Sequence, residues 1–320
     1  MALLEVKNLK IYYYTPAGVV RAVDGVDLYL ERGESLCIVG ESGSGKSTLG
    51  LGIAGLIEHP GRVVDGEVWF DGELVVSKTQ INTHRLLGKK ITMIFQDPRS
   101  ALNPVMRIGE QIVEMIMFNL GIDRSQAYRI AYELLQSVEI PDPKRVLDSY
   151  PHELSGGMAQ RVVIAIAIST KPELVIADEP TSALDVTIQA QILKLLRSAI
   201  KDQGRSLIFI THDLSVALEI CDRTLIMYAG KIVEEGLTKD IFIKPLHPYT
   251  SALLNSIPKI GSRSSRLPSL PGEPPQMTSP PKGCRFHPRC PARFEPCDNE
   301  EPPMFITDNK RRVACFLYRK

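Results

Sequence analysis

The sequence of 320 residues has almost no net charge and no long hydrophobic run. It carries 38 Lys and Arg residues against 37 Asp and Glu residues, a formal net charge of +1. The chain as a whole therefore has no electrostatic attraction to nucleic acid or to an anionic membrane. Its apolar runs, such as Val162 to Ile168, fall far short of the roughly 20 residues that a membrane-spanning helix needs. The N-terminal segment lacks a charged leader followed by an apolar stretch, so we expect a cytoplasmic protein.

The remaining composition is that of a folded protein. Hydrophobic residues make up 44% of the chain and charged residues 23%, which excludes a disordered or collagen-like protein. The length fits one large domain with an appendage, or two modest domains. Because cysteines rarely form disulfides in a reducing compartment, any clustering among the six cysteines indicates metal or redox chemistry.

The chain changes character near residue 258. Twelve of the 23 prolines fall between Pro258 and Pro303, where helices and central strands are disfavoured because proline lacks an amide donor. We therefore predict a main domain over residues 1–258 and a small, irregular, proline-rich C-terminal extension over residues 259–320. The extension holds four of the six cysteines: Cys284, Cys290, Cys297 and Cys315.

The main domain alternates short β-rich runs with helical periods, which predicts an α/β fold with a mixed sheet and flanking helices. A helical insertion is expected over about residues 99–157, where apolar residues recur at helical spacing from Ile108 onward. The predicted strands are Leu3 to Leu9, Ser35 to Val39, Glu67 to Phe70, Ile91 to Phe95, Leu174 to Ala177, Leu207 to Ile210 and Thr224 to Met227.

The first chemical motif is Gly40-Glu-Ser-Gly-Ser-Gly-Lys46-Ser47, which fits G-x-x-x-x-G-K-S between a predicted strand and a predicted helix. Glycines let this phosphate loop turn tightly and direct its amides at a β-phosphate, at the positive end of the helix dipole. Lys46 would contact the β- and γ-phosphates and Ser47 would bind Mg²⁺. The nucleotide-binding candidates here are Gly40, Ser42, Gly43, Ser44, Gly45, Lys46, Ser47 and Thr48.

The second motif is an acidic pair, Asp178-Glu179, at the end of the apolar run Leu174 to Ala177. Successive side chains on a strand face opposite ways, so the two carboxylates address different points. Asp178 would hold the Mg²⁺ shell, and Glu179 would act on the water that attacks the γ-phosphate. The two motifs together predict a nucleotide hydrolysis site.

The segment Leu154-Ser-Gly-Gly-Met158 narrows the prediction, because here the sequence resembles the ATP-binding subunits of ABC transporters. Their signature usually reads L-S-G-G-Q, and Met158 replaces the Gln. Gln96 in a Phe-Gln-Asp context, the turn Ser182-Ala-Leu-Asp185, and His212 in Thr-His-Asp follow the family order. The resemblance implies a P-loop ABC ATPase core with an antiparallel β subdomain and a helical subdomain.

The resemblance also implies residue roles. Two such domains would pack head to tail, with each ATP between the phosphate loop of one and the segment Ser155, Gly156 and Gly157 of the other. Glu179 would polarise the attacking water, His212 would hold the γ-phosphate and water in line, and Gln96 would sense the Mg²⁺ and water. Asp185 would contact the opposite subunit. Tyr13 aligns best with the aromatic residue that stacks on adenine, and its neighbours Tyr12 and Tyr14 remain alternatives, because strand alternation separates Tyr13 from them.

The extension, with Pro271-Gly-Glu-Pro-Pro275 and the run beginning His247-Pro-Tyr, resembles the oligopeptide/dipeptide branch of these ATPases. Some members of that branch bind a [4Fe-4S] cluster through four such cysteines. The five and six residues between the first three cysteines exceed the spacing usual for zinc ligands. Zinc remains open because His287 gives Cys-x-x-His-x-x-Cys, and free thiols or disulfides are further alternatives. The basic residues between these cysteines would offset cluster charge, form a solvated face or meet phospholipid headgroups near the permease; they are Arg285, Arg289 and Arg293.

The resemblance implies an ATP-hydrolysing subunit of an importer of oligopeptides, dipeptides or similar solutes, held peripherally at the cytoplasmic face of the membrane. Its implied partners are a second ABC ATPase, identical or paralogous, and the membrane permease. The helical insertion would contact a helix of the permease. An extracytoplasmic solute-binding protein would be an indirect partner. A related oligosaccharide importer is the main alternative. DNA-associated ABC ATPases need a long coiled coil, but only 107 residues separate Ser47 from Leu154. Ribosome-associated ABC factors have two nucleotide domains in one chain, and this sequence has one phosphate loop.

Overall fold

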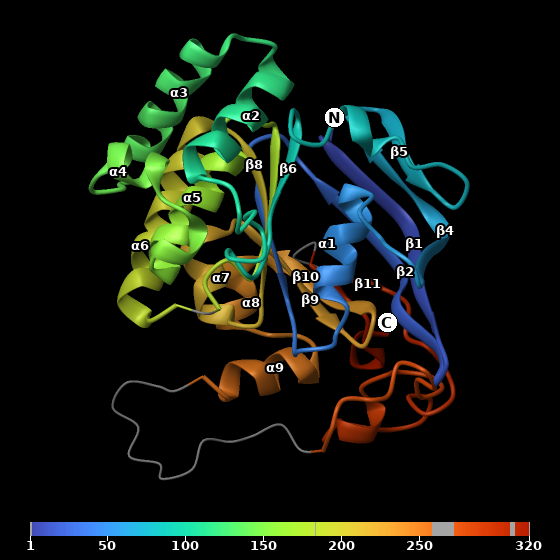
Figure 1. Ribbon diagram of the computed structural model, residues 1–320. Coiled ribbons are helices and arrows are strands. Elements are labelled where there is room, and N and C mark those ends of the chain that lie inside the picture. Colours follow the sequence, from blue (N-terminus) through green and yellow to red (C-terminus); the bar gives the residue numbers. More distant parts are fainter. Residues whose placement is uncertain (1, 183, 258–271, 308–310, 320) are drawn as a thin grey trace. The chain divides into compact units, whose positions relative to one another are not determined.

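The computed structural model describes residues 2–182, 184–257, 272–307 and 311–319. They form two compact units (Figure 1). The first unit comprises Met1–Glu31, Ser35–Asn82 and Thr211–Lys320, and the second comprises Arg32–Glu34 and Thr83–Ile210. The boundary expected at residue 258 falls at the start of residues 258–271, which lie outside the described residues, and it stays a prediction.

A four-stranded antiparallel sheet makes up one part of the first unit, and Figure 1 shows its long, twisted strands side by side. The strand order is β2-β1-β4-β5, and every pairing is antiparallel. The first two strands alternate buried and exposed residues over much of their length, as expected for a sheet with one face on a core. The strands are β1 (Leu4–Thr15), β2 (Gly18–Leu30), β4 (Gly61–Phe70) and β5 (Glu73–Ser77).

A second set of strands in the first unit carries the phosphate loop. Strand β3 pairs in parallel with β9. The remaining pairings are antiparallel: β9 pairs with β10, β10 with β12, and β12 with β11. The bounds are β3 (Ser35–Val39), β9 (Arg223–Tyr228), β10 (Lys231–Leu237), β11 (Phe305–Ile306) and β12 (Arg312–Val313), with helices α1 (Lys46–Ala54), α7 (Leu214–Ile220), α8 (Thr238–Ile243) and α9 (Pro248–Asn255). The C-terminal extension therefore supplies two short strands, both beyond the proline-dense stretch.

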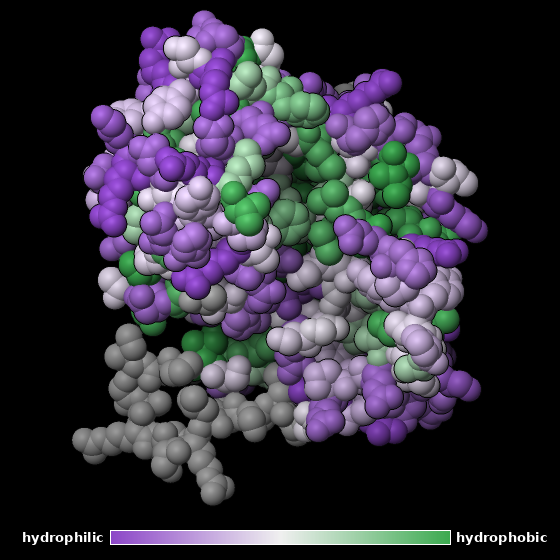
Figure 2. Space-filling view, in the orientation of Figure 1, coloured by the Kyte–Doolittle hydropathy of each residue, from purple (hydrophilic) through white to green (hydrophobic). Residues whose placement is uncertain are grey.

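The second unit combines three parallel strands with helices. The paired strands β6, β7 and β8 are hydrophobic and almost entirely buried, as is usual for parallel strands covered on both faces. Hydrophilic residues cover most of the helical surface visible in Figure 2. The bounds are β6 (Ile91–Ile94), β7 (Leu174–Asp178), β8 (Ser206–Thr211), α2 (Ile108–Leu120), α3 (Arg124–Ser137), α4 (Pro143–Asp148), α5 (Gly156–Ile168) and α6 (Val186–Ala199).

The predicted α/β fold is confirmed, and each of the seven predicted strands overlaps an observed one. The predicted helical insertion contains α2, α3 and α4. Strands β2, β5 and β10 were missed, as were the short strands β11 and β12 of the extension, which was expected to be irregular. In β10, Glu234 and Glu235 look like a solvated pair in the sequence, but both are buried because Arg311 and Arg223 pair with them. No helix in the described part of the chain has both the length and the apolar character to cross a membrane.

Helix α9 is anchored at its N-terminus by a buried histidine and a buried glutamate. The main-chain amides of Leu246 and His247 each donate to the Glu234 carboxylate at 2.9 Å. His247 Nδ1 accepts from the amide of Tyr249 at 3.0 Å and so caps the helix. Burial lowers the pKa of His247 to about 3, so its ring is neutral in the folded protein.

This burial predicts an acid-sensitive fold. In the unfolded chain the histidine takes up a proton near pH 6.5, whereas the folded protein does so only near pH 3, so stability falls as the pH drops below about 6.5. Between pH 6.5 and 5 the free energy of unfolding should fall by about 2 kcal/mol more in the wild type than in His247→Asn, which keeps a capping acceptor but does not titrate. Urea unfolding at the two pH values measures this, and equal losses in both proteins would contradict it.

Candidate nucleotide site

The phosphate loop, Gly40 to Ser47, joins β3 to α1 and lies against main chain on two sides. A Cβ on Gly40 would lie 2.1 Å from the carbonyl oxygen of Met227, and one on Gly45 would lie 2.0 Å from that of Ala22. Gly45, with φ +100°, is the N-cap of α1, and no side chain caps the helix. Helix α1 therefore begins without a side-chain cap, as is usual where a helix N-terminus receives phosphate.

Two side chains inside the loop fit an anionic ligand. The buried Lys46 Nζ donates to the carbonyl oxygens of Gly40 at 2.8 Å and Glu41 at 3.0 Å, which keeps its charge within the loop. Ser44 is also buried, and its hydroxyl has no hydrogen-bond partner in the described structure. A buried hydroxyl without a partner is costly, and a phosphate oxygen would relieve that cost. The loop exposes Ser42 and Gly43, and Ser47 and Thr48 are half-buried in the first turn of α1.

The acidic pair lies in the second unit, at the end of β7. Asp178 is the last residue of the strand and is buried. Glu179 has φ +43°, a left-handed conformation that non-glycine residues rarely adopt. Its amide donates to the carbonyl of Ile210 at 2.9 Å, and Ser182 donates to its carbonyl. Gln96 Nε2 lies 3.5 Å from Glu179 Oε2, so the structure brings these two predicted residues together.

The signature segment lies at the beginning of α5. Ser155 is the N-cap, and its hydroxyl accepts from the amide of Met158 at 3.3 Å. Gly156 is the first residue of α5, and a Cβ on Gly157 would lie 3.0 Å from the Ile188 side chain on α6. Met158 lines a surface pocket together with Ser155 and Gly157. Asp185 caps α6 by accepting from the amides of Thr187 and Ile188, and its contact with an opposite subunit stays a prediction.

Two further candidates lie in the first unit. His212 directly follows β8, and its side chain is exposed. Tyr13 on β1 is half-buried, whereas Tyr14 is more exposed. The hydroxyl of Tyr12 donates to Asp24 at 2.6 Å, and burial together with this bond raises the pKa of Tyr12 to about 12. Tyr12 is therefore held within its sheet, and the assignment of an adenine platform stays a prediction.

The four cysteines of the extension interact with one another electrostatically. Burial, opposed by the amide of Phe286 and assisted by the neighbouring thiols of the other three cysteines, raises the pKa of Cys284 to about 11. Three of the thiols also accept a main-chain amide two residues ahead, from Phe286, Ala292 and Leu317 respectively. Such amide bonds stabilise thiolates and are one means by which proteins tune metal-bound sulfur.

No group of three or more His, Cys, Asp or Glu side chains among the described residues could hold a metal ion. The iron–sulfur and zinc predictions thus receive no support from this criterion. His287 Nδ1 lies 2.9 Å from the carbonyl oxygen of Cys284, so that ring nitrogen is engaged with the main chain. Cys37 and Cys221 are buried, as is usual for thiols that pack as small hydrophobic groups.

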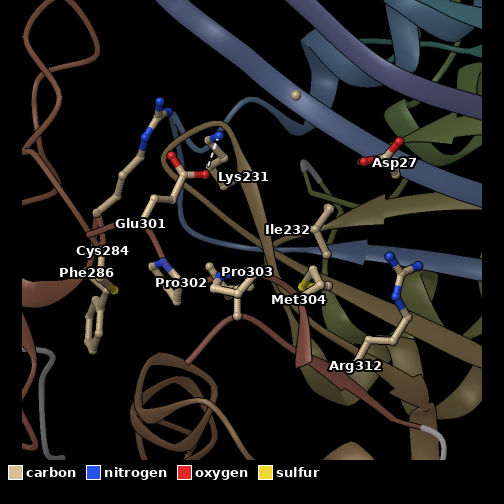
Figure 3. Close-up of a pocket in the computed structure, with 14 residues that line it drawn as sticks. Asp27, Lys231, Ile232, Cys284, Phe286, Glu301, Pro302, Pro303, Met304 and Arg312 are labelled. Carbon is tan, nitrogen blue, oxygen red and sulfur yellow. Dashed lines mark ion pairs between the residues drawn. The ribbon is translucent and has the colours of Figure 1, made fainter. Parts of the chain in front are cut away.

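The alternative interpretation of the arginines between the cysteines, a solvated face, is wrong for two of the three, and their compensation of cluster charge stays a prediction. Arg285 is buried and pairs with Asp24, and Arg289 is buried and pairs with Glu41 in the phosphate loop. Only Arg293 is exposed, paired with Asp298. The reason is that the extension packs on β2 and β10, where it closes a small pocket of about 160 Å³ (Figure 3). Lys231 on β10 forms an ion pair across this pocket with Glu301, at 2.6 Å.

The chain matches two family profiles. Residues 23–182 match the family described as "ABC transporter", and residues 233–297 match "Oligopeptide/dipeptide transporter, C-terminal region". The first match contains the phosphate loop, the acidic pair and the signature, and the second contains three of the four cysteines of the extension. The chain belongs to the ABC transporter family.

Relatives match this ABC protein over nearly its full length. It is 44% identical to the oligopeptide transport ATP-binding protein AppD of Bacillus subtilis, over 99% of this chain and 97% of that protein. It is 45% identical to the dipeptide transport ATP-binding protein DppD of Escherichia coli, over 98% and 96% of the two chains. A solved dimer of the ATP-binding cassette MJ0796, with ADP and Pi, has a TM-score of 0.65 and 28% identity, covering 73% of this chain and 98% of that chain.

The ABC ATPase prediction is thereby confirmed, and ATP with Mg²⁺ is the nucleotide expected for such a protein. Sequence reasoning missed the residues that hold the phosphate loop from outside, namely Tyr249 and Arg289. A faint signal was available, since Glu41 is a carboxylate inside a loop that binds anions and thus requires a cationic partner.

The loop geometry predicts unequal effects of alanine at two of its glycines. Gly45→Ala should lower the free energy of unfolding by about 3 kcal/mol, because its methyl group would collide with the main chain of β2. Gly43→Ala is the matched control: its φ is also positive, at +78°, but nothing lies within 4 Å of the added carbon. Gly43→Ala should lower the free energy of unfolding by only about 1 kcal/mol. Chemical unfolding followed by circular dichroism measures both, and a Gly45→Ala protein as stable as Gly43→Ala would refute the account.

Proposed function

We propose that this ABC ATPase couples ATP hydrolysis to the import of oligopeptides or dipeptides through a membrane permease, from the cytoplasmic face of the membrane. The observation that carries the proposal is that two profiles match one chain, an ABC profile and the C-terminal profile of the oligopeptide/dipeptide transporters. Its ATPase partner, identical or paralogous, would pack head to tail with it, in keeping with the dimeric cassette of 28% identity. The ATPase domain would span residues 1–258 and the extension residues 259–320.

The proposed catalytic roles follow the positions of the side chains in each unit. Glu179 is the general base for the attacking water, which its strained backbone and its proximity to Gln96 support. Asp178 and Ser47 hold Mg²⁺, assisted by Gln96, and Lys46 and the loop amides bind the phosphates. His212 aligns the γ-phosphate and the water. Ser155, Gly156 and Gly157 receive the nucleotide of the partner subunit.

The test is peptide uptake by vesicles that contain this chain with its permease and partner ATPase. Wild-type vesicles should take up labelled di- or oligopeptide in an ATP-dependent manner, and Glu179→Gln should slow hydrolysis at least about 100-fold because the general base is lost. Glu173→Gln is the matched control: its carboxylate precedes the same strand, β7, and pairs with Arg32 and Lys90 near the surface. Hydrolysis unchanged in Glu179→Gln would refute the base assignment.

The solute is tested in the same vesicles. Uptake of labelled oligosaccharide without uptake of peptide would replace the proposed substrate class by the related oligosaccharide importer. Hydrolysis stimulated by a peptide-loaded binding protein supports the proposal, because the solute acts on this chain only through its partners.

We further propose that Cys284, Cys290, Cys297 and Cys315 ligate a [4Fe-4S] cluster. The main-chain amides donated to three of the sulfur atoms support it, because such bonds stabilise thiolates, and a bound cluster would supply the positive charge that holds the buried thiols in that form. Zinc is the alternative, and the five and six residues between the first three cysteines exceed the spacing usual for zinc ligands. The cluster would tie together the loop Cys284 to Cys297 and the segment after β12.

Purified, anaerobically handled protein should contain about four iron atoms per chain and absorb near 400 nm. Cys290→Ser should lose iron, whereas Cys221→Ser, at a buried thiol outside the extension, should retain it. Stoichiometric zinc without iron would refute the cluster.

A further inference from the structure

The C-terminal extension contacts the phosphate loop through an ion pair between Arg289 of the extension and Glu41 of the loop. The guanidinium of Arg289 donates two hydrogen bonds to this carboxylate, from Nη1 to Oε2 at 2.7 Å and from Nη2 to Oε1 at 3.1 Å. The side chain of Arg289 is 5% exposed and that of Glu41 is 23% exposed. A bidentate pair fixes the plane of the carboxylate as well as its position. The hydrogen bond to Glu41 also raises the pKa of Arg289, so the guanidinium stays protonated.

The main chain of Glu41 is held as well. Its amide donates to the Tyr249 hydroxyl at 2.8 Å, and its carbonyl accepts from Lys46 Nζ at 3.0 Å. The side chain, the amide and the carbonyl of this one residue are thus bound by three different segments: the extension, helix α9 and helix α1. The second residue of the phosphate loop has little freedom left.

An aromatic cluster holds Arg289 in this place. The rings of Tyr228, Tyr249 and Phe286 lie with centroids 4.5, 5.2 and 5.4 Å apart in pairs. The Arg289 guanidinium lies 5.9 Å from the Tyr228 ring centroid, and its Nη1 donates to the Tyr228 hydroxyl at 3.3 Å. Phe286 and Arg289 both lie between Cys284 and Cys290, so packing connects the cysteine loop to the phosphate loop.

A carboxylate in this loop creates an electrostatic problem. The loop must attract a triphosphate, and an unpaired Glu41 would repel it. Arg289 supplies the compensating positive charge and is itself buried, so no mobile counter-ion from solvent can replace it fully.

We propose that Arg289 is a positioning residue for ATP binding. It neutralises Glu41 and fixes the second residue of the phosphate loop, so that the C-terminal extension sets the affinity for the nucleotide. The inference rests on the nucleotide binding of an ABC ATPase, and it is independent of the transported solute and of the metal proposed for the cysteines.

The test is equilibrium binding of a fluorescent ATP analogue with Mg²⁺ to the purified full-length chain. Arg289→Met should weaken binding about tenfold, because it leaves Glu41 unpaired beside the phosphates. The double variant Glu41→Gln with Arg289→Met should bind within about threefold of the wild type, since the repelling carboxylate is gone. Arg293→Met is the matched control: the same residue type lies in the same cysteine loop, but its ion pair is exposed, so affinity should not change.

Two results would overturn the proposal: Arg289→Met binding as tightly as the wild type, or the double variant binding as weakly as Arg289→Met. The second result would assign the loss to general disruption of the extension, since a merely structural role is not rescued by removing the Glu41 charge. If thermal unfolding shows that Arg289→Met is not folded, Arg289→Gln is used instead, because glutamine keeps a hydrogen-bond donor and lacks the charge. The same two results would then overturn the proposal. Binding of the analogue by the wild-type protein tests separately whether the chain has a nucleotide site.

Discussion

The phosphate loop lies so close to the main chains of β2 and β9 that side chains are sterically excluded at Gly40 and Gly45. This contact fixes where α1 begins and therefore where the main-chain amides of its first turn point. It also turns Lys46 back onto the carbonyls of its own loop, where the ammonium group is buried but satisfied. The affinity of the site for anions thus depends first on the close packing of the loop against the main chains of β2 and β9. The position of the Lys46 side chain follows from that packing. Glu41 is the exception within this loop, because its charge opposes the ligand and has to be cancelled from elsewhere.

The acidic pair at the end of β7 is positioned by local backbone strain at Glu179. Glu179 occupies a left-handed conformation immediately before Pro180, and proline restricts the backbone of the residue that precedes it. Such a conformation costs of order 1–3 kcal/mol and persists only where neighbouring contacts enforce it. Here the amide of Glu179 is bound by Ile210 and its carbonyl by Ser182. The consequence is that Glu179 departs from the straight course of β7 and comes close to Gln96, which strand alternation alone does not predict.

The sequence was sufficient wherever the deciding physics is local. Buried parallel strands appear as short apolar runs, and a phosphate loop requires glycine at fixed positions, so the seven strands and the phosphate loop between β3 and α1 could be predicted. It was insufficient where a charge is compensated by a distant residue. Glu234 pairs with Arg311, and Arg289 pairs with Glu41, across 77 and 248 residues respectively. Each of these groups looks solvated when only its neighbours are considered, because a single sequence carries no record of which opposite charge folds against it. The strands missed in the first unit include β10, which contains two such glutamates.

These distant pairs also explain why a proline-rich segment can hold a defined position. Buried ion pairs add little net stability, because desolvation offsets most of their attraction, but breaking one leaves an uncompensated charge in the interior. A displaced extension would leave Asp24, Glu41 and Glu234 without Arg285, Arg289 and Arg311, and each of these losses is costly. The position of the extension is therefore determined by these three ion pairs more than by the burial of apolar area. One of the three acidic partners, Glu41, belongs to the phosphate loop. The same ion pair therefore fixes the position of the extension and sets the charge next to the bound phosphates.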